Sequence, residues 1–534
     1  MGRRGGCKHQ EQGNGAERHD NPKSVLVLHR RSFSRIGLRV RAGVRQTSSV
    51  PACSGSAPDR VSSAALRCRV PPSSPMSDSP SPRSDPYTVR EGGAVEPPPN
   101  WRARLRYLGP SVVISGSIVG SGEIILTSGL GAAAGFVMLW WVLLSCWIKS
   151  LIQAELGRYI LVSGDTYVRA MNRLPGKIPL GRGLISLPVL IALIAIIPGI
   201  MGLGGIIGGA GQALTLLYPT LHSTWAAGLI AVVVIGLLIT GSYKILENVM
   251  LALVMTFTAA TLVCAFLMQN TQYAVTRADL LSGMTFSFPP EYLVAAIAVY
   301  GYTGVNASET SAYQYWCVEK GYPNFIGRSD APGWEARARG WIKVLQADVW
   351  VTLIILTCAT LPFYILGAGV LRARGSVPDG LETLSVLSEM FTETLGAWSV
   401  WLFGIGAFCI LFSTMLSSVA GAARYIPDYI MELGYLNRQN LVARRSWIRG
   451  YCATIPVVSF VIYLSIQNPR LLVTIGALTL AMLLPIQSGA VLWFQKNRMD
   501  PRIRPGRWIR GGIWAIFLVE LVMTWFVIRY VVFG

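Results

Sequence analysis

The sequence predicts an all-α integral membrane protein with about 11 transmembrane helices. Of its 534 residues, 52% are hydrophobic and only 14% are charged, which is too little charge for a soluble chain of this length. From about residue 107 the sequence forms successive apolar runs, each near the roughly 20 residues that a helix needs to cross a bilayer. Two of these runs share a short motif of small residues that ends in a glutamate.

The N-terminal segment differs from the rest of the chain. Residues 1–75 hold 14 Lys and Arg against 4 Asp and Glu, which is about half of the net charge of +20, and they are rich in Arg, Ser, Gly and Pro. Such a composition cannot bury a core, so we expect residues 1–106 to be disordered. A basic arm, an organelle transit peptide and a start assigned too early all fit this segment. We favour the last, with the true start at Met76.

The remaining residues, 107–534, are expected to form one transmembrane domain. It would contain two repeats, at about 107–270 and 285–495, and an extra helix at about 510–533. The third run is long and contains the stretch PGIMGLGGIIGGAG, so a tilted helix, a kinked helix and a miscount all fit it. The expected spans cover residues 109–132, 135–157, 184–217, 224–242, 245–268, 287–316, 341–370, 396–422, 447–467, 469–494 and 510–533.

Positive charge in the connections indicates the orientation in the membrane. If the N-terminus is cytoplasmic, the connections on the cytoplasmic side hold most of the Lys and Arg residues. The opposite side has only Arg277, Arg372, Arg374 and Arg470. Because Lys and Arg accumulate in cytoplasmic connections, this asymmetry supports 11 spans, with the N-terminus inside and the C-terminus outside. We expect the membrane to be a bacterial inner membrane.

The first and sixth runs contain matching motifs, VGSGE at residues 119–123 and VNASE at residues 305–309. Five spans separate them, and this odd offset reverses the orientation of the second unit in the membrane. The pattern is typical of transporters with inverted repeats, whose substrate site lies near the bilayer midplane between interrupted helices. Small residues allow a helix to unwind, so that backbone carbonyls and amides face a cavity.

Glu123 lies in the middle of the first run, where a charged side chain costs about 3 kcal/mol. Contact with a bound cation would offset this cost, which makes Glu123 a candidate ligand or gate. Alternatively, Glu123 pairs with an intramembrane cation such as Lys149, or it is protonated and packed. Glu309 is a second candidate, but it could lie in an aqueous vestibule, because the sixth run becomes polar just beyond it.

Several stretches resemble one family. GPSVVISGSIVGSGE, followed by WWVLLSCWIKSLIQAELGRYILVSGDT, resembles the first two helices of the Nramp divalent-metal transporters, which belong to the APC superfamily. YKILEN, ADVWVTLIILTCATLPFYILGAG and STMLSSVAGAARYIPDYI resemble later parts of that family. The resemblance covers about residues 108–532. It implies a LeuT-type inverted 5+5 repeat, with helices one and six broken, in a divergent member of the family.

The departures from the family's pattern fall at its metal site. The family's Asp-Pro-Gly-Asn motif corresponds to GSGE at residues 120–123, so the carboxylate has moved by about one helical turn. The family's Met-Pro-His-Asn motif corresponds to TGVN at residues 303–306, which keeps the Asn but lacks the thioether and the imidazole. The resemblance therefore implies an all-oxygen metal site whose candidate ligands are Glu123, Asn306, Thr303, Glu309, Gly120 and Ser117.

Such a site favours hard ions. Carboxylate, amide and carbonyl oxygens suit Mg²⁺ or Mn²⁺, whereas sulfur favours softer metals, so Cd²⁺ is expected to be a poor substrate. The acidic pair on the family's proton route corresponds to Gly202 and Gly205. We therefore expect transport that is uncoupled from protons or coupled differently. Ser121, Lys149, Glu247 and Asp348 are further candidates for a supporting or gating role.

A second substrate class fits the same stretch. SIVGSGEI also resembles the break in helix one of amino-acid/polyamine/organocation transporters, where backbone amides hold the substrate carboxylate. Glu123 stands where those carriers typically have an apolar residue, and its charge would repel a carboxylate. An amine or a polyamine would not be repelled. Such a carrier is the alternative to a metal transporter.

Motifs of other function classes are missing from the sequence. It has no P-loop, no Gly-x-Ser-x-Gly elbow and no zinc-ligand spacing, and its 9 cysteines are scattered singly. A membrane scaffold with a decayed, inactive site is a third alternative. We expect no enzymatic activity, no cofactor and no nucleic-acid partner. The expected partners are the transported divalent metal ion and the lipid bilayer.

Overall fold

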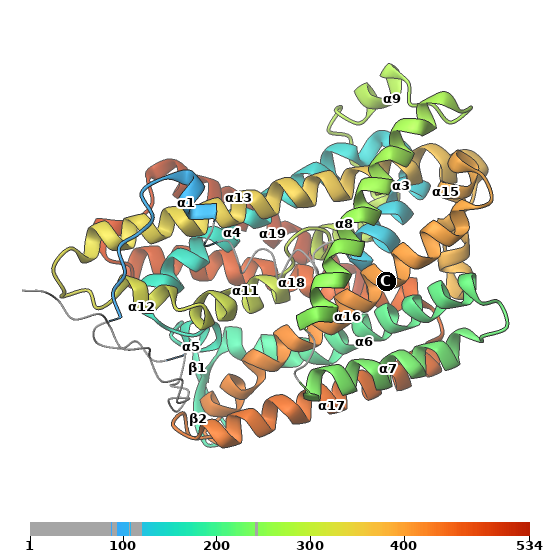
Figure 1. Cartoon of the computed structure of the whole chain (residues 1–534). Helices are drawn as coiled ribbons and strands as arrows, with labels where there is room; N and C mark the ends of the chain where they lie inside the picture. Colours follow the sequence, from blue (N-terminus) through green and yellow to red (C-terminus); the bar gives the residue numbers. More distant parts are fainter. Residues whose placement is uncertain (1–86, 88–92, 106, 108–119, 241–243, 534) are drawn as a thin grey trace, which may run out of the picture. The chain divides into compact units, whose positions relative to one another are not determined.

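The computed structural model describes residues 87, 93–105, 107, 120–240 and 244–533, without the side chains of residues 244–251 and 530–533. The expected segment 1–106, with Met76, lies largely outside these residues, and its domain boundary stays a prediction. The described chain is almost entirely helical (Figure 1), as expected from the sequence. Its long helices are α4 (Leu139–Ser163), α6 (Leu187–Leu217), α7 (Ser223–Thr240), α8 (Lys244–Leu267), α13 (Trp334–Leu366), α16 (Ser399–Glu432), α17 (Leu441–Ile466), α18 (Pro469–Asn497) and α19 (Arg507–Phe533).

Shorter elements connect or interrupt these helices. A β-hairpin, which the sequence analysis did not anticipate, follows α5 and pairs Lys177 with Ser186 and Leu180 with Gly183. The short elements are α1 (Trp101–Leu105), α3 (Ser128–Ala134), α5 (Tyr167–Asn172), β1 (Lys177–Leu180), β2 (Gly183–Ser186), α9 (Arg277–Ser282), α10 (Leu293–Tyr302), α11 (Ala307–Glu319), α12 (Tyr322–Ile326), α14 (Arg372–Arg374), α15 (Thr383–Leu395) and the π-helical turns η1 (Gly122–Thr127) and η5 (Gly367–Leu371).

In the part of the chain that the structure describes, 9 helical runs are long and apolar enough to cross a membrane. The first of them, Gly122–Ser163, contains the end of the first expected span and all of the second, which meet at Gly135, where φ is +64°. The sixth expected span is the pair of α10 and α11. Counted in this way, the described helices are consistent with the 11 spans that the sequence predicts.

The glycine-rich third span is one helix. α6 runs without interruption from Leu187 to Leu217 and contains Pro198, so the miscount that the sequence left open is excluded. Its glycines allow close packing against α18. A Cβ atom on Gly205 would lie 2.6 Å from the carbonyl oxygen of Pro469, and one on Gly202 would lie 3.2 Å from the Cα atom of Gly476. The backbones of α6 and α18 therefore nearly touch.

We expect Gly205→Ala to destabilise the protein by about 1–3 kcal/mol, because the added methyl group meets backbone atoms that cannot move independently. The matched control is Gly199→Ala in the same helix, where a Cβ atom meets nothing within 4 Å. Alanine is the better helix former by roughly 1 kcal/mol, so this control should be neutral or stabilising. Thermal unfolding of both purified variants measures the difference, and equal midpoints would contradict the packing described for α6.

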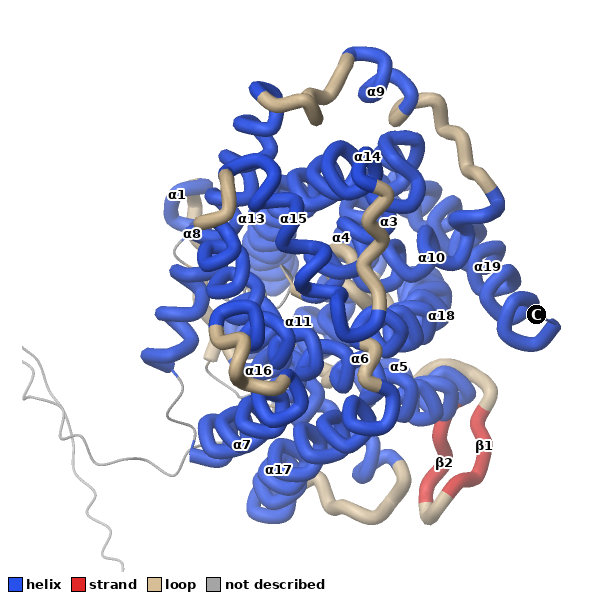
Figure 2. The backbone as a smooth tube through the Cα atoms, turned by 90° about the vertical axis from the view of Figure 1, so that its right-hand side faces the viewer, coloured by secondary structure: helices blue, strands red, loops and turns tan. Residues whose placement is uncertain are grey.

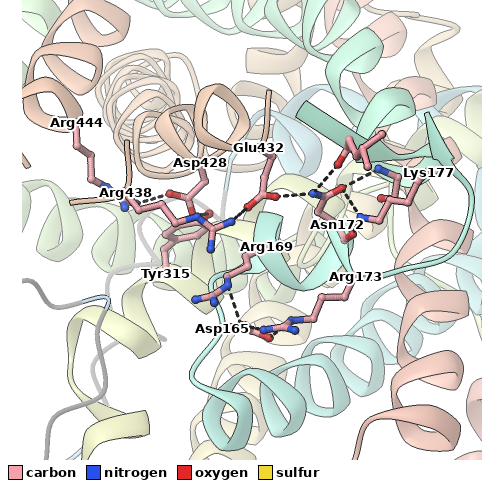
Figure 3. A network of polar contacts seen from close by, with 12 residues as sticks. Asp165, Arg169, Asn172, Arg173, Lys177, Tyr315, Asp428, Glu432, Arg438 and Arg444 are labelled. Carbon is pink, nitrogen blue, oxygen red and sulfur yellow. Dashed lines mark hydrogen bonds and ion pairs between the residues drawn. The ribbon is translucent and has the colours of Figure 1, made fainter. Parts of the chain in front are cut away.

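A polar network joins the elements at one end of the helices (Figure 3). Asn172 of α5 donates hydrogen bonds to the carbonyl oxygen of Leu184 in β2, at 3.2 Å, and to Glu432 of α16, at 2.5 Å. Asp428 of α16 accepts a hydrogen bond from Tyr315 of α11 at 2.6 Å and pairs with an arginine of α17, Arg444, at 2.8 Å. Figure 2 shows the hairpin beside α5 at this end. These contacts connect the hairpin to helices from both expected repeats.

Candidate functional site

The sixth span is interrupted by an extended segment, as the sequence predicts. α10 ends at Tyr302 and α11 begins at Ala307, and the residues between them are not helical. Gly304 has a φ of +80°, a conformation that favours glycine. The break that the sequence predicts in the first span involves residues before Gly120, which lie outside the described part of the chain; from Gly120 the chain continues into η1.

Glu123, in η1, lies against this break. Its side chain is 1% exposed. Oε2 accepts a hydrogen bond from the backbone N–H of Gly120 at 2.9 Å, and Oε1 accepts longer ones from Gly304 N at 3.3 Å and Thr360 Oγ1 at 3.4 Å. The carboxylate therefore bridges the first span, the break in the sixth span and α13. Because each carboxylate oxygen can accept two bonds, Oε2 has capacity for a further partner.

Backbone and hydroxyl oxygens surround the same junction. A Cβ atom on Gly122 would lie 3.2 Å from the carbonyl oxygen of Tyr302, so glycine permits this close approach. Tyr302 is the last residue of α10, and carbonyls at a helix C-terminus lack intrahelical donors and carry partial negative charge. The hydroxyls of Thr127 and Thr303 lie 2.9 Å apart. Carbonyl and hydroxyl oxygens thus lie at the junction of the first and sixth spans.

Lys149 neutralises the C-terminal end of α10. This side chain of α4 is completely buried, and its ammonium donates hydrogen bonds to the carbonyl oxygens of Tyr300 and Thr303. It also lies 5.1 Å from the centre of the Tyr300 ring. A positive charge at the C-terminal end of a helix is stabilising. The Lys149 ammonium thus contacts these carbonyls. The Glu123 carboxylate accepts hydrogen bonds from Gly120, Gly304 and Thr360 instead, so the two side chains do not form the direct Glu123–Lys149 pair that the sequence left open.

Asn306 and Glu309 form a capping box at the start of α11. The Oδ1 atom of Asn306 accepts hydrogen bonds from the backbone N–H groups of Ser308 at 2.9 Å and Glu309 at 3.0 Å. In return, the Oε2 atom of Glu309 accepts one from Asn306 N at 3.1 Å. Both lone pairs of Asn306 Oδ1 are therefore engaged. Asn306 could bind a cation only if this cap opened.

The remaining candidate residues lie around the junction or away from it. Ser121 is completely buried next to the Tyr302 hydroxyl. Asp348 of α13 is also completely buried and accepts a hydrogen bond from Tyr313 of α11 at 2.7 Å, so it joins two helices beyond the break. Ser117 and the side chain of Glu247 lie outside the described part of the chain.

The structure adds two residues that the sequence analysis did not select. Thr360 bonds to Glu123, and Glu520 of α19, which is 1% exposed, accepts hydrogen bonds from Tyr300 at 2.9 Å and Ser488 at 2.6 Å. Glu520 interrupts an apolar run, which is the signal that identified Glu123. Thr360 has no such signal, because hydroxyl residues are common inside membrane helices.

A divalent ion at this junction would depend on more than acidic side chains. Among the described residues, no group of three or more His, Cys, Asp or Glu side chains could hold a metal ion. Glu123 would have to be joined by carbonyl and hydroxyl oxygens. Hard ions accept such mixed oxygen ligands, whereas softer metals prefer sulfur or imidazole.

Comparison with known proteins identifies relatives along most of the chain. A model of the Nramp family, described as natural resistance-associated macrophage protein-like, matches residues 111–529. The divalent metal cation transporter MntH of Bacillus subtilis is 22% identical over 433 residues, which cover 80% of this chain and 93% of that protein.

Solved structures show the same fold. A mutant of the Eremococcus coleocola manganese transporter has a TM-score of 0.57 and 16% identity, with 82% of this chain and 89% of that chain covered. MhsT in complex with L-phenylalanine has a TM-score of 0.52 and 15% identity, with 81% and 98% covered. These neighbours confirm the expected LeuT-type fold. The family model matches well over half of this chain, which therefore belongs to the Nramp family.

Proposed function

We propose that this protein carries a hard divalent metal cation, such as Mg²⁺ or Mn²⁺, across a membrane by alternating access. The observation that supports this most strongly is the buried Glu123 carboxylate, which lies where the first span meets the break in the sixth. A relative named as a divalent metal cation transporter and a structural neighbour named as a manganese transporter support the substrate class. The cytoplasmic N-terminus and the outside C-terminus stay predictions.

We infer that Glu123 is the principal ligand and that oxygen atoms of the adjoining break, the carbonyl of Tyr302 and the hydroxyl of Thr303, contribute. Gly120 acts through its backbone N–H, which holds the carboxylate. Asn306 and Glu309 would join only after the capping box opened. Since that box defines the first turn of α11, their participation would link ion binding to a movement of this helix.

We also infer that the third span carries no proton. The resemblance assigns Gly202 and Gly205 to the positions of the family's acidic pair, and both lie against the backbone of α18. A carboxylate side chain at either position would force α6 and α18 apart. Transport should therefore be independent of a pH gradient or use a titratable group elsewhere.

Two hydrogen bonds argue against the alternative function, that of an amino-acid carrier. An amino-acid carrier of this fold would offer the backbone amides at the breaks to the substrate carboxylate. Here Gly120 N and Gly304 N both donate to Glu123. The Glu123 side chain thus occupies the place that a substrate carboxylate would take.

Thermal unfolding of the purified protein tests this proposal. A ligand at 100 times its Kd stabilises the folded state by about 2.7 kcal/mol, so Mn²⁺ or Mg²⁺ should raise the unfolding midpoint and Cd²⁺ should do so less. Glu123→Gln should lose the shift. Stabilisation by amino acids alone, or the same metal shift in Glu123→Gln, would contradict a metal site at this residue.

A further inference from the structure

α10 and α19 lie side by side (Figure 2), and a groove of about 550 Å³ runs between them on the surface of the helix bundle. The groove is open, because Leu518 and Val522 in its α19 wall are 57% and 56% exposed. Among the described side chains that line it, the only nitrogen or oxygen atom is Nε1 of Trp141, which already donates a hydrogen bond to the carbonyl oxygen of Ala296 at 2.8 Å. The groove therefore suits a hydrocarbon chain. The apolar and aromatic residues that form its two walls include Phe288, Leu293, Ile297, Leu518, Val522 and Phe526.

The length of the groove corresponds to one leaflet of a membrane. α19 is long and apolar enough to cross the membrane, and its lining stretch, from Leu518 to Phe526, rises about 12 Å. This is close to half of a hydrocarbon core of about 30 Å. An acyl chain occupies one leaflet, whereas a helix from a second copy of the protein would pack along the whole span. The length therefore favours a lipid over a second copy.

The C-terminal end of α19 has the features of a membrane interface. Trp525 is 54% exposed, and the ring centroids of Trp140 and the groove residue Phe288 lie 6.3 Å apart. Tryptophan side chains are enriched at the level of the lipid headgroups. Arg529 follows Trp525 by one turn, and its guanidinium lies 5.5 Å from the centre of that ring. Among the described residues, no acidic side chain pairs with Arg529, so a cation lies at headgroup level without a built-in anion.

Arg529 lies on the same face of α19 as the groove. It follows Val522 by seven residues and Leu518 by eleven, which are about two and three turns at roughly 3.6 residues per turn. The three side chains therefore project from one face of the helix. A chain that lay in the groove would place its headgroup beside the guanidinium.

We propose that this groove binds an anionic phospholipid, with one acyl chain between α10 and α19 and its phosphate against Arg529. Guanidinium and phosphate form strong, bidentate hydrogen bonds, and close packing against apolar side chains adds van der Waals contacts along the chain. α10 leads directly into the break that Glu123 contacts. A bound lipid therefore stabilises the position of a helix at the proposed ion site, although Glu123 takes no part in binding the lipid.

Native mass spectrometry of the purified full-length protein, titrated with phosphatidylglycerol, tests this proposal. The wild type should bind one lipid more tightly than any further lipids. Val522→Trp, which fills the groove, should weaken this first binding about tenfold, because the chain loses its packing contacts. The matched control is Leu521→Trp, which should stay within about twofold, since Leu521 is 44% exposed but does not line the groove.

Diacylglycerol with the same acyl chains measures the contribution of the phosphate. The wild type should bind it about fivefold more weakly than phosphatidylglycerol, which is the effect of one cationic side chain on an anionic lipid. Arg529→Gln should abolish this difference. Arg510→Gln removes the same charge from an exposed position at the other end of α19 and should preserve the difference.

The proposal would be wrong if Val522→Trp and Leu521→Trp bound phosphatidylglycerol equally, or if Arg529→Gln still preferred it to diacylglycerol. It would also be wrong if the wild type bound no lipid more tightly than the rest. A dimer that Val522→Trp dissociates would show instead that a second copy fills the groove. The Arg529 comparison changes nothing within the groove, so it decides the matter even if Val522→Trp fails to fold. None of these measurements depends on metal binding.

Discussion

Uptake of Mn²⁺ into proteoliposomes is expected to fall at least about a hundredfold when Glu123 is replaced by glutamine. Glutamine has nearly the same shape and keeps one oxygen atom, but it removes the negative charge. A unit charge about 4 Å from another contributes roughly 4 kcal/mol at an intermediate dielectric constant, and the effect is larger for a divalent ion. Such a loss of binding is more than enough for a hundredfold decrease, since about 1.4 kcal/mol corresponds to tenfold.

Glu520→Gln is the matched control for this experiment. Glu520 is also a buried intramembrane carboxylate, but it lies in α19 and accepts hydrogen bonds from Tyr300 and Ser488 rather than from residues of the break. Glutamine can keep both hydrogen bonds after the serine hydroxyl turns. This variant should therefore retain most of the Mn²⁺ uptake. If both variants lost uptake equally, removing either buried carboxylate would be enough to stop transport, and Glu123 would have no special role in binding the ion.

Lys149→Met is expected to destabilise the protein by about 3 kcal/mol and to impair transport. The variant leaves the carbonyl oxygens of Tyr300 and Thr303 without their charged donor in a fully buried place. Hydrogen bonds from charged groups contribute about 1.5–3 kcal/mol each, and an unsatisfied buried partner adds to the loss. Thermal unfolding in detergent measures the change. The end of α10, and with it the break that faces Glu123, should lose its fixed position.

Lys343→Met provides the comparison for Lys149→Met. Lys343 lies in α13 with an exposed side chain, and substitutions at such positions usually change stability by less than about 0.5 kcal/mol. The same chemical change should thus have a large effect at one lysine and almost none at the other. A Lys149→Met protein that unfolded with the wild-type midpoint would show that the ammonium does not stabilise the break.

The break in the sixth span and the burial of Glu123 could be predicted because both depend on local features. Gly304 and the polar residues that follow it interrupt an apolar run, and no continuous helix is expected there. A carboxylate in the middle of such a run must be buried against a partner or a ligand, because lipid cannot solvate it. One sequence therefore identified the position of the junction, although not its partners.

The hydrogen-bond partners at this junction could not be predicted because they are distant from one another in the sequence. Lys149 contacts a carbonyl 151 residues away, the Thr360 hydroxyl reaches Glu123 across 237 residues, and Tyr300 reaches Glu520 across 220. No pattern of spacing identifies such pairs. The π-helical turn at Glu123 and the hairpin after α5 likewise depend on packing against other elements.

Asn306 and Glu309 illustrate a different limit. Their spacing is that of a capping box, and this local interpretation needed no structure. The resemblance to a metal-transporter motif led instead to the selection of Asn306 as a ligand, and the match between the first and sixth spans led to the selection of Glu309; both stay predictions. The structure describes the capped arrangement, so the two interpretations now differ in one observable respect, namely whether the cap opens when an ion binds.

The most direct test of the account is uptake of divalent ions by the wild-type protein in proteoliposomes, measured across Mg²⁺, Mn²⁺ and Cd²⁺ with and without a pH gradient. Saturable uptake of Mn²⁺ or Mg²⁺ and poor uptake of Cd²⁺ are expected. Because the third span lacks titratable side chains, any effect of the pH gradient on uptake would have to come from groups outside that span. Failure to transport any divalent ion, or a clear preference for Cd²⁺, would contradict a hard-cation site formed around Glu123.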